Sequence, residues 1–328
     1  MKSHFTYPEF HAPSSDSVAS YGMTAARTDV LSEVLTLIRL RGELVYTAEL
    51  GAPWGIRYAP GPAHFHFVEQ GTLWVLAAGT EPMCLDAGDL VLLPHGNGHV
   101  IADDPGTSPT NIDWLTTQHF NRDDLSFRFG GVGMQTKLVG GFFSFEGSPL
   151  PAIMSALPTV IHIPRVPGGA QPWLAAISHF LVEEAHQPYP GSSLMISRLI
   201  DLLVIRALRS WAAGHAQRGG WLGGLGEQRI GRALSAIHGD PFRRWTVQAL
   251  ADIALMSRSI FAERFVSTVG EPPLHYVTRW RMTIAADLIR SGGLKVTEAA
   301  QRVGYASDAA FSRAFKAHFG HAPSEAKR

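Results

Sequence analysis

Apolar positions in the last hundred residues recur with the spacing of amphipathic helices. Phe261 and Phe265 lie four residues apart, as do Phe311 and Phe315, so each pair is expected on one face of a helix. In both places a Ser precedes the two Phe, and a Gly and a Pro follow them at the same spacing. Such a repeat indicates that one supersecondary unit occurs twice.

Each copy is predicted to form a helix, a tight turn and a second helix, over 246–266 in one unit and 296–317 in the other. Thr246 and Thr297 are the expected N-caps of the two leading helices. Ser307 is the expected N-cap of the closing helix in the second unit. Both units therefore carry the local signals for starting a helix as well as its apolar face.

The turns of the two units differ. Gly304 suits a turn that needs positive φ, whereas the first unit has Leu255 at its turn, which predicts local strain. A helix over 273–290 is expected to join the units, because Pro273 can start it. That helix spans roughly 27 Å at 1.5 Å per residue.

The residues opposite the two Phe faces are expected to be exposed on the second helix of each unit. This arrangement is typical of a recognition helix that enters the major groove of DNA. The candidate DNA contacts are Ser257, Arg258, Ser259, Ala262, Glu263, Ser307, Asp308, Ala309, Ser312, Arg313 and Lys316. Arg313 is the best candidate for a base contact, because Arg pairs well with the edge of guanine.

Further motifs occur in the same region, at Arg279–Met282 in the joining helix and at Phe319–Pro323 near the end. Together with the repeated units, residues Trp245 to Arg328 resemble the DNA-binding domain of the AraC/XylS family of bacterial transcription regulators. The resemblance implies a one-component, sequence-specific regulator whose recognition helices enter two major grooves of double-stranded DNA. RNA polymerase is a further candidate partner.

The texture changes in the first half of the chain, where short apolar runs alternate with Gly and Pro turns. Strands of this length and spacing predict a β-barrel or a sandwich. The expected strands are Glu43–Glu49, Gly55–Tyr58, Ala63–Glu69, Thr72–Ala77, Met83–Leu85, Asp89–Leu93 and His99–Ala102. Residues 103–165 are expected to continue as β and irregular structure.

One segment, Gly88–His99, fits the second cupin motif, which aims its His into a barrel. Beside the C-terminal repeat it resembles the cupin-type sensor domain of AraC-like regulators, which implies a small-molecule effector. The chain departs from the first cupin motif, because His64 and His66 lie too close to Gly71. The expected fold is α+β with two domains, an N-terminal cupin-like barrel with appended helices and a C-terminal all-α domain.

The chemistry of the barrel leaves two alternatives. An organic effector is expected to contact His64, His66, His99, Trp54 and Trp74. The alternative is a divalent metal such as zinc, nickel or iron, bound by the same three His residues. It would belong to a dioxygenase-like cupin enzyme fused to a DNA-binding tail. The altered first motif favours a sensor with no metal, no cofactor and no enzymatic activity.

Two helices are expected after the barrel, over 171–186 and 193–214. The second is apolar over most of its circumference, which predicts a homodimer that buries the remaining face. Its expected contacts are Leu199, Leu202 and Leu208. The expected organisation is a sensor over 1–165 that includes a short helix over 30–40, a connector over 166–218, a Gly-rich linker over 219–226 and a DNA-binding domain over 227–328.

Charge supports this division. The formal net charge of the whole chain is zero. Residues 226–328 hold 15 Lys and Arg against 9 Asp and Glu, whereas residues 1–225 hold 13 against 19. The positive half is the one expected to meet DNA. The single cysteine, Cys84, argues against an internal disulfide and zinc fingers. Charges interrupt the most apolar run, so no membrane span is expected and the protein should be cytoplasmic.

Overall fold

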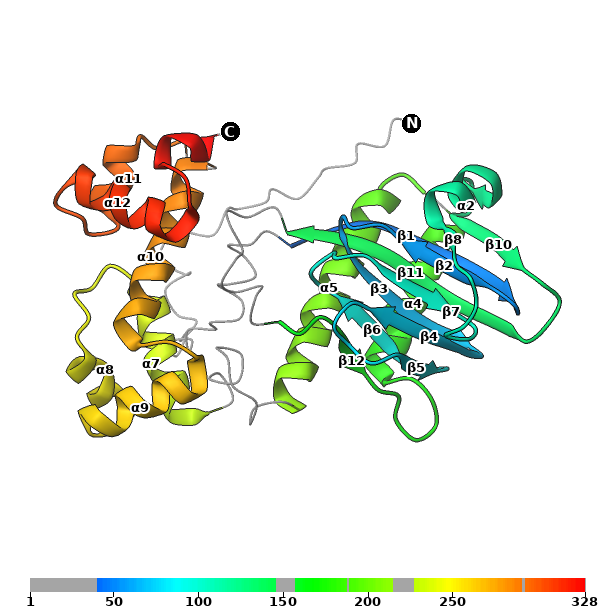
Figure 1. Cartoon of the computed structure of the whole chain (residues 1–328), viewed down its shortest axis with the longest axis horizontal. Coiled ribbons are helices and arrows are strands. Elements are labelled where there is room, and N and C mark those ends of the chain that lie inside the picture. Colours follow the sequence, from blue (N-terminus) through cyan, green and yellow to red (C-terminus); the bar gives the residue numbers. More distant parts are fainter. Residues whose placement is uncertain (1–39, 146–156, 188, 215–226, 291–292, 328) are drawn as a thin grey trace, which may run out of the picture.

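A computed structural model describes residues 40–145, 157–187, 189–214, 227–290 and 293–327. Figure 1 shows a β-rich N-terminal part with two long helices and an all-helical C-terminal part. The helix predicted over 30–40 falls almost wholly outside the described residues, and the linker predicted over 219–226 falls wholly outside them. Among the helices of the described segments, none has the length and apolar character needed to cross a membrane.

The N-terminal strands form two sheets. One has the order β12-β6-β3-β11-β1-β10-β9 and the other the order β5-β4-β7-β2-β8. The strands are β1 (Leu40–Gly51), β2 (Gly55–Tyr58), β3 (Ala63–Gln70), β4 (Thr72–Ala77), β5 (Met83–Asp86), β6 (Leu90–Leu93), β7 (His99–Ala102), β8 (Thr110–Asn111), β9 (Phe120–Asn121), β10 (Ser126–Gly130), β11 (Gln135–Phe145) and β12 (Ile161–Ile163). The predicted strands between 43 and 102 are confirmed to within a few residues at their ends.

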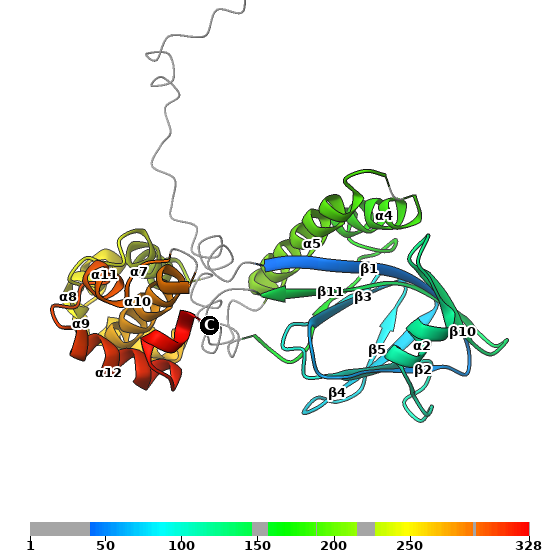
Figure 2. The same ribbon diagram turned by 90° about the horizontal axis from the view of Figure 1, so that it is seen from above.

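The sheets face each other as an open sandwich, so the predicted cupin-like barrel is present but is not closed. Within the described residues no backbone pairing joins an edge strand of one sheet to an edge strand of the other. Figure 2 shows α4 (Pro172–His186) and α5 (Ser192–Gly214) covering the outer face of the first sheet. Strand β3 is consequently buried on both faces: Phe65 and Phe67 pack with the core that includes these helices, and Val68 packs between the sheets.

Helix α5 lies against β1 at a position that only glycine permits. A Cβ atom added to Gly42 would lie 2.4 Å from the Cβ of Ile200. The carboxylate of Asp201 accepts a hydrogen bond from the backbone N–H of Gly42 at 2.9 Å and pairs with Arg198. Because this contact buries one side of α5, the prediction that Leu208 contacts a second subunit is wrong; it is buried within the subunit.

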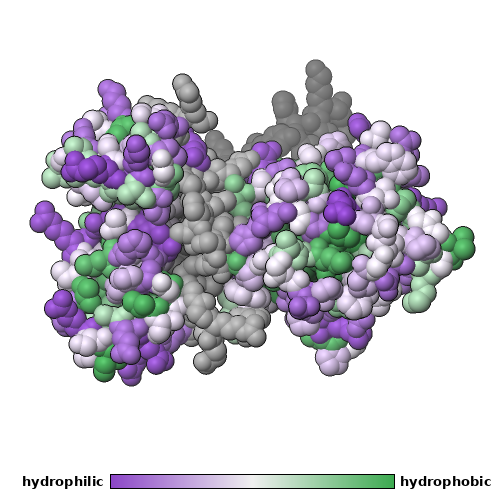
Figure 3. All heavy atoms as spheres, in the orientation of Figure 1, coloured by the Kyte–Doolittle hydropathy of each residue, from purple (hydrophilic) through white to green (hydrophobic). Residues whose placement is uncertain are grey.

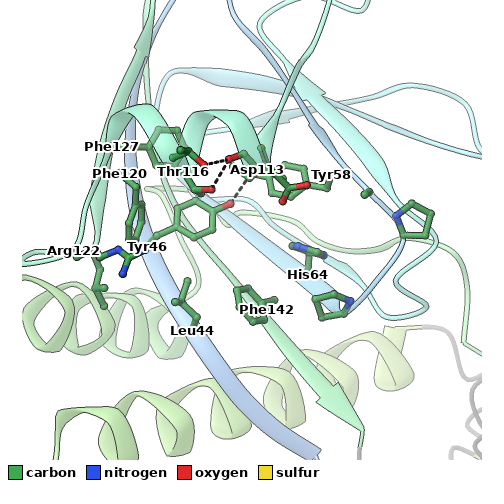
Figure 4. Close-up of a pocket in the computed structure, with 16 residues that line it drawn as sticks. Leu44, Tyr46, Tyr58, His64, Asp113, Thr116, Phe120, Arg122, Phe127 and Phe142 are labelled. Atoms are coloured by element: carbon green, nitrogen blue, oxygen red, sulfur yellow. Dashed lines mark hydrogen bonds between the residues drawn. The ribbon is translucent and has the colours of Figure 1, made fainter.

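Helix α2 (Ile112–His119) was not predicted, because its sequence gives little signal. It buries only Leu115, so no apolar stripe of helical period is present. Its start is set locally, since the side chain of Asn111 accepts a hydrogen bond from the backbone N–H of Asp113 at 2.8 Å. The helix lies beside β10 and forms part of the wall of a cavity (Figures 2 and 4).

The C-terminal part confirms the two predicted helix–turn–helix units and the joining helix. The elements are α7 (Gln228–Gly239), α8 (Val247–Ala254), α9 (Arg258–Val269), α10 (Pro273–Arg290), α11 (Val296–Arg302), α12 (Asp308–Phe319) and the 3-10 helix η2 (Pro323–Lys327). Phe261, Phe265, Phe311 and Phe315 are all fully buried. Phe311 and Phe315 therefore form a small core of their own, whereas Phe261 and Phe265 belong to a larger cluster of buried residues.

Two of the three predicted caps are confirmed. The hydroxyl of Thr246 accepts from the backbone of Ala249 at 3.1 Å, and Ser307 caps α12. The prediction that Thr297 caps α11 is wrong, because the helix begins at Val296 with Lys295 as its N-cap residue. The carboxylate of Glu298 accepts from the backbone N–H of Lys295 at 3.1 Å and fixes that earlier start.

The predicted difference between the two turns is also confirmed. Gly304 has a φ of 89°, and Leu255 has a φ of 57° in the left-handed region. A left-handed residue with a Cβ costs roughly 1–2 kcal/mol. The first turn therefore stores strain that the second avoids.

Candidate ligand cavity and nucleic-acid interface

A cavity of about 950 Å³ opens at one end of the sandwich, between β1, β3, β11 and α2 (Figure 4). Much of its wall is apolar. The apolar side chains include Leu44, Ile112, Phe120, Leu125, Phe127 and Phe142. The uncharged polar side chains are those of Tyr46, Tyr58, His64, Thr116 and Thr117, and cavities that combine an apolar wall with such groups bind small molecules. Asp113 and Arg122 supply one charge of each sign.

Tyr58 connects the cavity to the buried histidines. Its hydroxyl lies 2.6 Å from that of Tyr46, within hydrogen-bond distance. Its ring stacks on His99, with centroids 4.5 Å apart, and meets His64 edge-on at 4.9 Å. His64 and Tyr58 therefore form one wall of the cavity, with His99 packed against it.

His66 and His99 lie together, as the strand positions predict, with their Nε2 atoms 2.7 Å apart. Both are buried. They contact Tyr58 and do not line the cavity, whereas His64 does. Of the three predicted histidines, only His64 is therefore positioned to touch a molecule in this cavity.

Burial keeps these groups uncharged. Desolvation lowers the pKa of His64 to about 4, with an opposing effect of the Pro62 backbone. Desolvation, followed by the charge of His64, lowers the pKa of His99 to about 3. The pKa of His66 is also lowered by burial, and burial raises the pKa values of Tyr46 and Tyr58. The cavity wall that His64 and Tyr58 form is therefore uncharged at neutral pH.

The free energy of unfolding is expected to fall as the pH drops from about 6.5 towards 4. The unfolded chain protonates its histidines below about 6.5, whereas the folded chain keeps His64 and His99 neutral to lower pH. Each such histidine contributes up to about 1.4 kcal/mol per pH unit. Urea unfolding measured between pH 6.5 and 4 tests this. The free energy of unfolding should depend less steeply on pH in His64→Gln than in the unmodified protein. The exposed His179→Gln is the control, and an equal slope in both variants would contradict the assignment.

Two predicted pocket residues do not line this cavity. Trp54 is buried in the core between the sheets. Trp74 alternates with the buried Leu73 and Val75 along β4, so its side chain lies on the opposite face. Tyr46 lines the cavity but was not predicted. Side chains alternate between the two faces of β1, and that of Tyr46 points into the space between the sheets, as do those of Ala48 and Leu50.

The three histidines do not fit a metal ion as they are arranged. Zinc–nitrogen bonds of about 2.0–2.1 Å would hold two tetrahedral ligand atoms roughly 3.4 Å apart. His66 and His99 are closer than this because they share a hydrogen bond. Within the described segments, no group of three or more His, Cys, Asp or Glu side chains is arranged to hold a metal.

The candidate nucleic-acid interface lies on α9 and α12, opposite their buried Phe pairs. Most of the predicted contact residues are exposed there, and Ala262 and Ser312 are half-buried. Ser257 and Ser307 are N-cap residues, and their hydroxyls accept backbone hydrogen bonds. Ile260, which was not predicted, is 57% exposed beside the predicted residues of α9. The sequence could have indicated this exposure, because Ile260 lies just outside the apolar face that contains Phe261.

Two family models match the chain. One described as Cupin matches residues 29–213, and one described as Helix-turn-helix domain matches residues 250–328. The first match covers the sandwich with α4 and α5, and the second begins within α8. The two matches agree with the two parts of the fold.

Relatives match over nearly the whole chain. A putative AraC-like transcription regulator from Streptomyces lividans is 35% identical over 92% of this chain and 98% of its own. The HTH-type transcriptional regulator AlkR from Acinetobacter baylyi is 32% identical over 90% of this chain and 97% of its own. Each of these relatives is thus similar to both parts of the chain.

Solved structures are more distant. ToxT from Vibrio cholerae is 11% identical, covers 87% of this chain and 96% of its own, and has a TM-score of 0.34. The DNA-binding domain of AdpA, solved in complex with a target DNA, is 27% identical, covers 31% of this chain and 91% of its own, and has a TM-score of 0.30.

Proposed function

We propose, because the chain belongs to the AraC/XylS family of transcription regulators, that a small molecule in the cavity beside Tyr58 controls its binding to DNA. The C-terminal domain is a DNA-binding helix-turn-helix domain, and the N-terminal domain is cupin-like. One observation carries the proposal: a cavity of about 950 Å³ whose wall combines apolar side chains with polar ones. Such cavities are typical of small-molecule sites.

The effector assignment is tested by filling the cavity. Thr116 lines the cavity from the exposed side of α2, so Thr116→Trp adds a large side chain there without entering the core. Gln118→Trp places the same side chain on the same helix at an exposed position outside the cavity lining. A compound found by thermal-shift screening should stabilise the unmodified protein by about 2.7 kcal/mol at a hundred times its Kd.

Thr116→Trp should abolish that stabilisation, and Gln118→Trp should retain it. Affinity for DNA in the absence of the compound should be the same in both variants. Stabilisation that persists in Thr116→Trp would place the effector elsewhere.

We propose that α9 and α12 each contact a major groove through their exposed residues. Arg313 has no ion-pair partner among the described residues. Its guanidinium is therefore available for a guanine edge. Glu263 can accept from a cytosine amine, and Ile260 can contact a thymine methyl group.

We propose that the cupin-like domain acts as a sensor without a resident metal ion or an enzymatic activity. The relatives that match it are named as transcription regulators. The shared hydrogen bond of His66 and His99 supports this assignment. Elemental analysis of protein purified without a His-tag tests it. About one metal per chain, lost in His64→Ala, His66→Ala and His99→Ala, would favour the enzyme alternative.

We propose that α5 forms a homodimer contact. Met195 and Leu202 are each 51% exposed and lie seven residues apart, so they share a face. Leu194 is exposed beside them, and Phe180 is exposed on α4. Monomeric proteins seldom expose several large apolar side chains on two neighbouring helices, so we expect a second copy of the chain to cover them.

Leu202→Glu is expected to turn the dimer into a monomer, because it places a charge in the proposed contact. Sedimentation velocity at tens of micromolar measures the change. Val132→Glu is the matched control, since Val132 is fully exposed in the loop between β10 and β11. A monomer in the unmodified protein, or a dimer that survives Leu202→Glu, would exclude this contact.

A further inference from the structure

The walls of the cavity limit the chemistry of its ligand. Aromatic and aliphatic side chains from β1, β10 and β11 surround its interior, as Figure 4 shows for Leu44, Phe127 and Phe142. The two charged side chains, Asp113 and Arg122, are both exposed and have opposite signs. Arg122 lies beside Phe120, on the far side of the view from His64 (Figure 4). Among the described residues that line the cavity, no cation therefore lies at its polar end, which Tyr58 and His64 form.

That polar end has an unused hydrogen-bond donor. The hydroxyls of Tyr46 and Tyr58 together carry two hydrogens, and the bond between them uses one. Neither hydroxyl has another hydrogen-bond partner among the described residues. Both side chains are buried and line the cavity. One O–H is consequently available to an acceptor atom inside the cavity, and an unmet donor in such a place is costly.

The ligand group that accepts this hydrogen bond should be uncharged. Moving a carboxylate into an apolar cavity is costly unless a cation pairs with it. His64, the histidine that lines the cavity beside Tyr58, stays neutral because burial lowers its pKa to about 4. A hydroxyl or carbonyl oxygen satisfies the tyrosine pair without that cost.

We propose that the cavity binds an uncharged, mainly apolar molecule that offers a hydroxyl or carbonyl oxygen to the Tyr46–Tyr58 pair. The proposal rests on the proposed function, because it names the ligand class of the same effector cavity. The apolar body of the ligand packs against the side chains of Leu44, Phe127 and Phe142, and its oxygen faces the hydroxyl pair.

Matched pairs of compounds test the ligand class on the full chain. Octanol and octanoate share an alkyl body, and naphthol and naphthoate share an aromatic one. For at least one body the neutral compound should raise the midpoint of thermal unfolding, and its Kd should be at least tenfold lower than that of the matching carboxylate. Tighter binding of the carboxylates, or stabilisation by none of the four compounds, would overturn the proposal.

Two variants assign the polar contact. Tyr58→Phe removes the hydroxyl and keeps the ring that packs on the histidines, and should weaken binding of the neutral compound about fivefold. Tyr46→Phe is the second test of the pair. Arg122→Gln removes the positive charge of the cavity and should change the Kd by less than about twofold. Unchanged binding in both tyrosine variants, or a large loss in Arg122→Gln, would overturn the proposal.

The same samples separate this proposal from the function on which it rests. Affinity for DNA is measured with and without each compound. A neutral compound that binds as expected and leaves DNA affinity unchanged would contradict the proposed regulation and leave the ligand class standing. A carboxylate that binds and changes DNA affinity would support the regulation and overturn the ligand class.

Discussion

Phe311→Ala is expected to destabilise the second helix–turn–helix unit by about 3–5 kcal/mol. Phe311 is fully buried, and its ring contacts those of Phe315 and Tyr305 at centroid distances of 5.6 Å each. The core of this unit is small, so it cannot close over the space that the ring leaves. Both the lost burial and the cavity therefore count against the variant.

Hydrogen exchange in peptides from α12 measures this loss, because it reports opening of that unit alone. Exchange in these peptides should accelerate by two to three orders of magnitude, at about 1.4 kcal/mol for each tenfold change. Leu274→Ala is the control, since Leu274 is an exposed apolar residue of α10 and its removal should cost under about 0.5 kcal/mol. Equal effects of the two changes would contradict the assignment of Phe311 to the core.

Arg313→Ala is expected to weaken specific DNA binding by about 1–3 kcal/mol and to relax the base preference at one position. Arg313 is exposed on α12, opposite the buried Phe311 and Phe315. Lys316 is also exposed on this helix. It lies in the last turn of α12, where a lysine is expected to contact phosphate.

The two side chains should therefore be distinguishable. Lys316→Ala should weaken binding to all sequences about equally. It should also reduce the slope of log affinity against log salt concentration by about one. Affinities for a site selected from random DNA, and for its single base-pair variants, should be measured at a fixed salt concentration. A sequence preference that is unchanged in Arg313→Ala would leave Arg313 as a phosphate contact or no contact.

Much of the C-terminal domain could be predicted because its signals are local. The Phe pairs lie one helical turn apart, and Thr246 and Ser307 cap helices through hydrogen bonds within three residues. Thr297 was misassigned because Glu298, a neighbouring side chain, competes for the start of α11. Both outcomes come from interactions within a few residues.

The N-terminal domain was less predictable because its contacts are distant in sequence. The alternation of apolar and polar residues located the strands, but it does not show which strands pair. Strand β10, for example, pairs in parallel with β1 although the two are distant in sequence. Leu208 was misassigned because a helix that is apolar all round does not show which side its own sheet covers. The Tyr46–Tyr58 contact joins strands of different sheets, so neither strand alone signals it.

The central claim is that occupancy of the cavity beside Tyr58 and binding of DNA by α9 and α12 are coupled. The most direct test measures the Kd of the full chain for its selected DNA site with and without a saturating cavity ligand. We expect a change of about five- to 150-fold in that Kd, and an equal change in the Kd of the ligand when DNA is bound. A ligand that binds in the cavity, is excluded by Thr116→Trp and leaves the DNA affinity unchanged would contradict it.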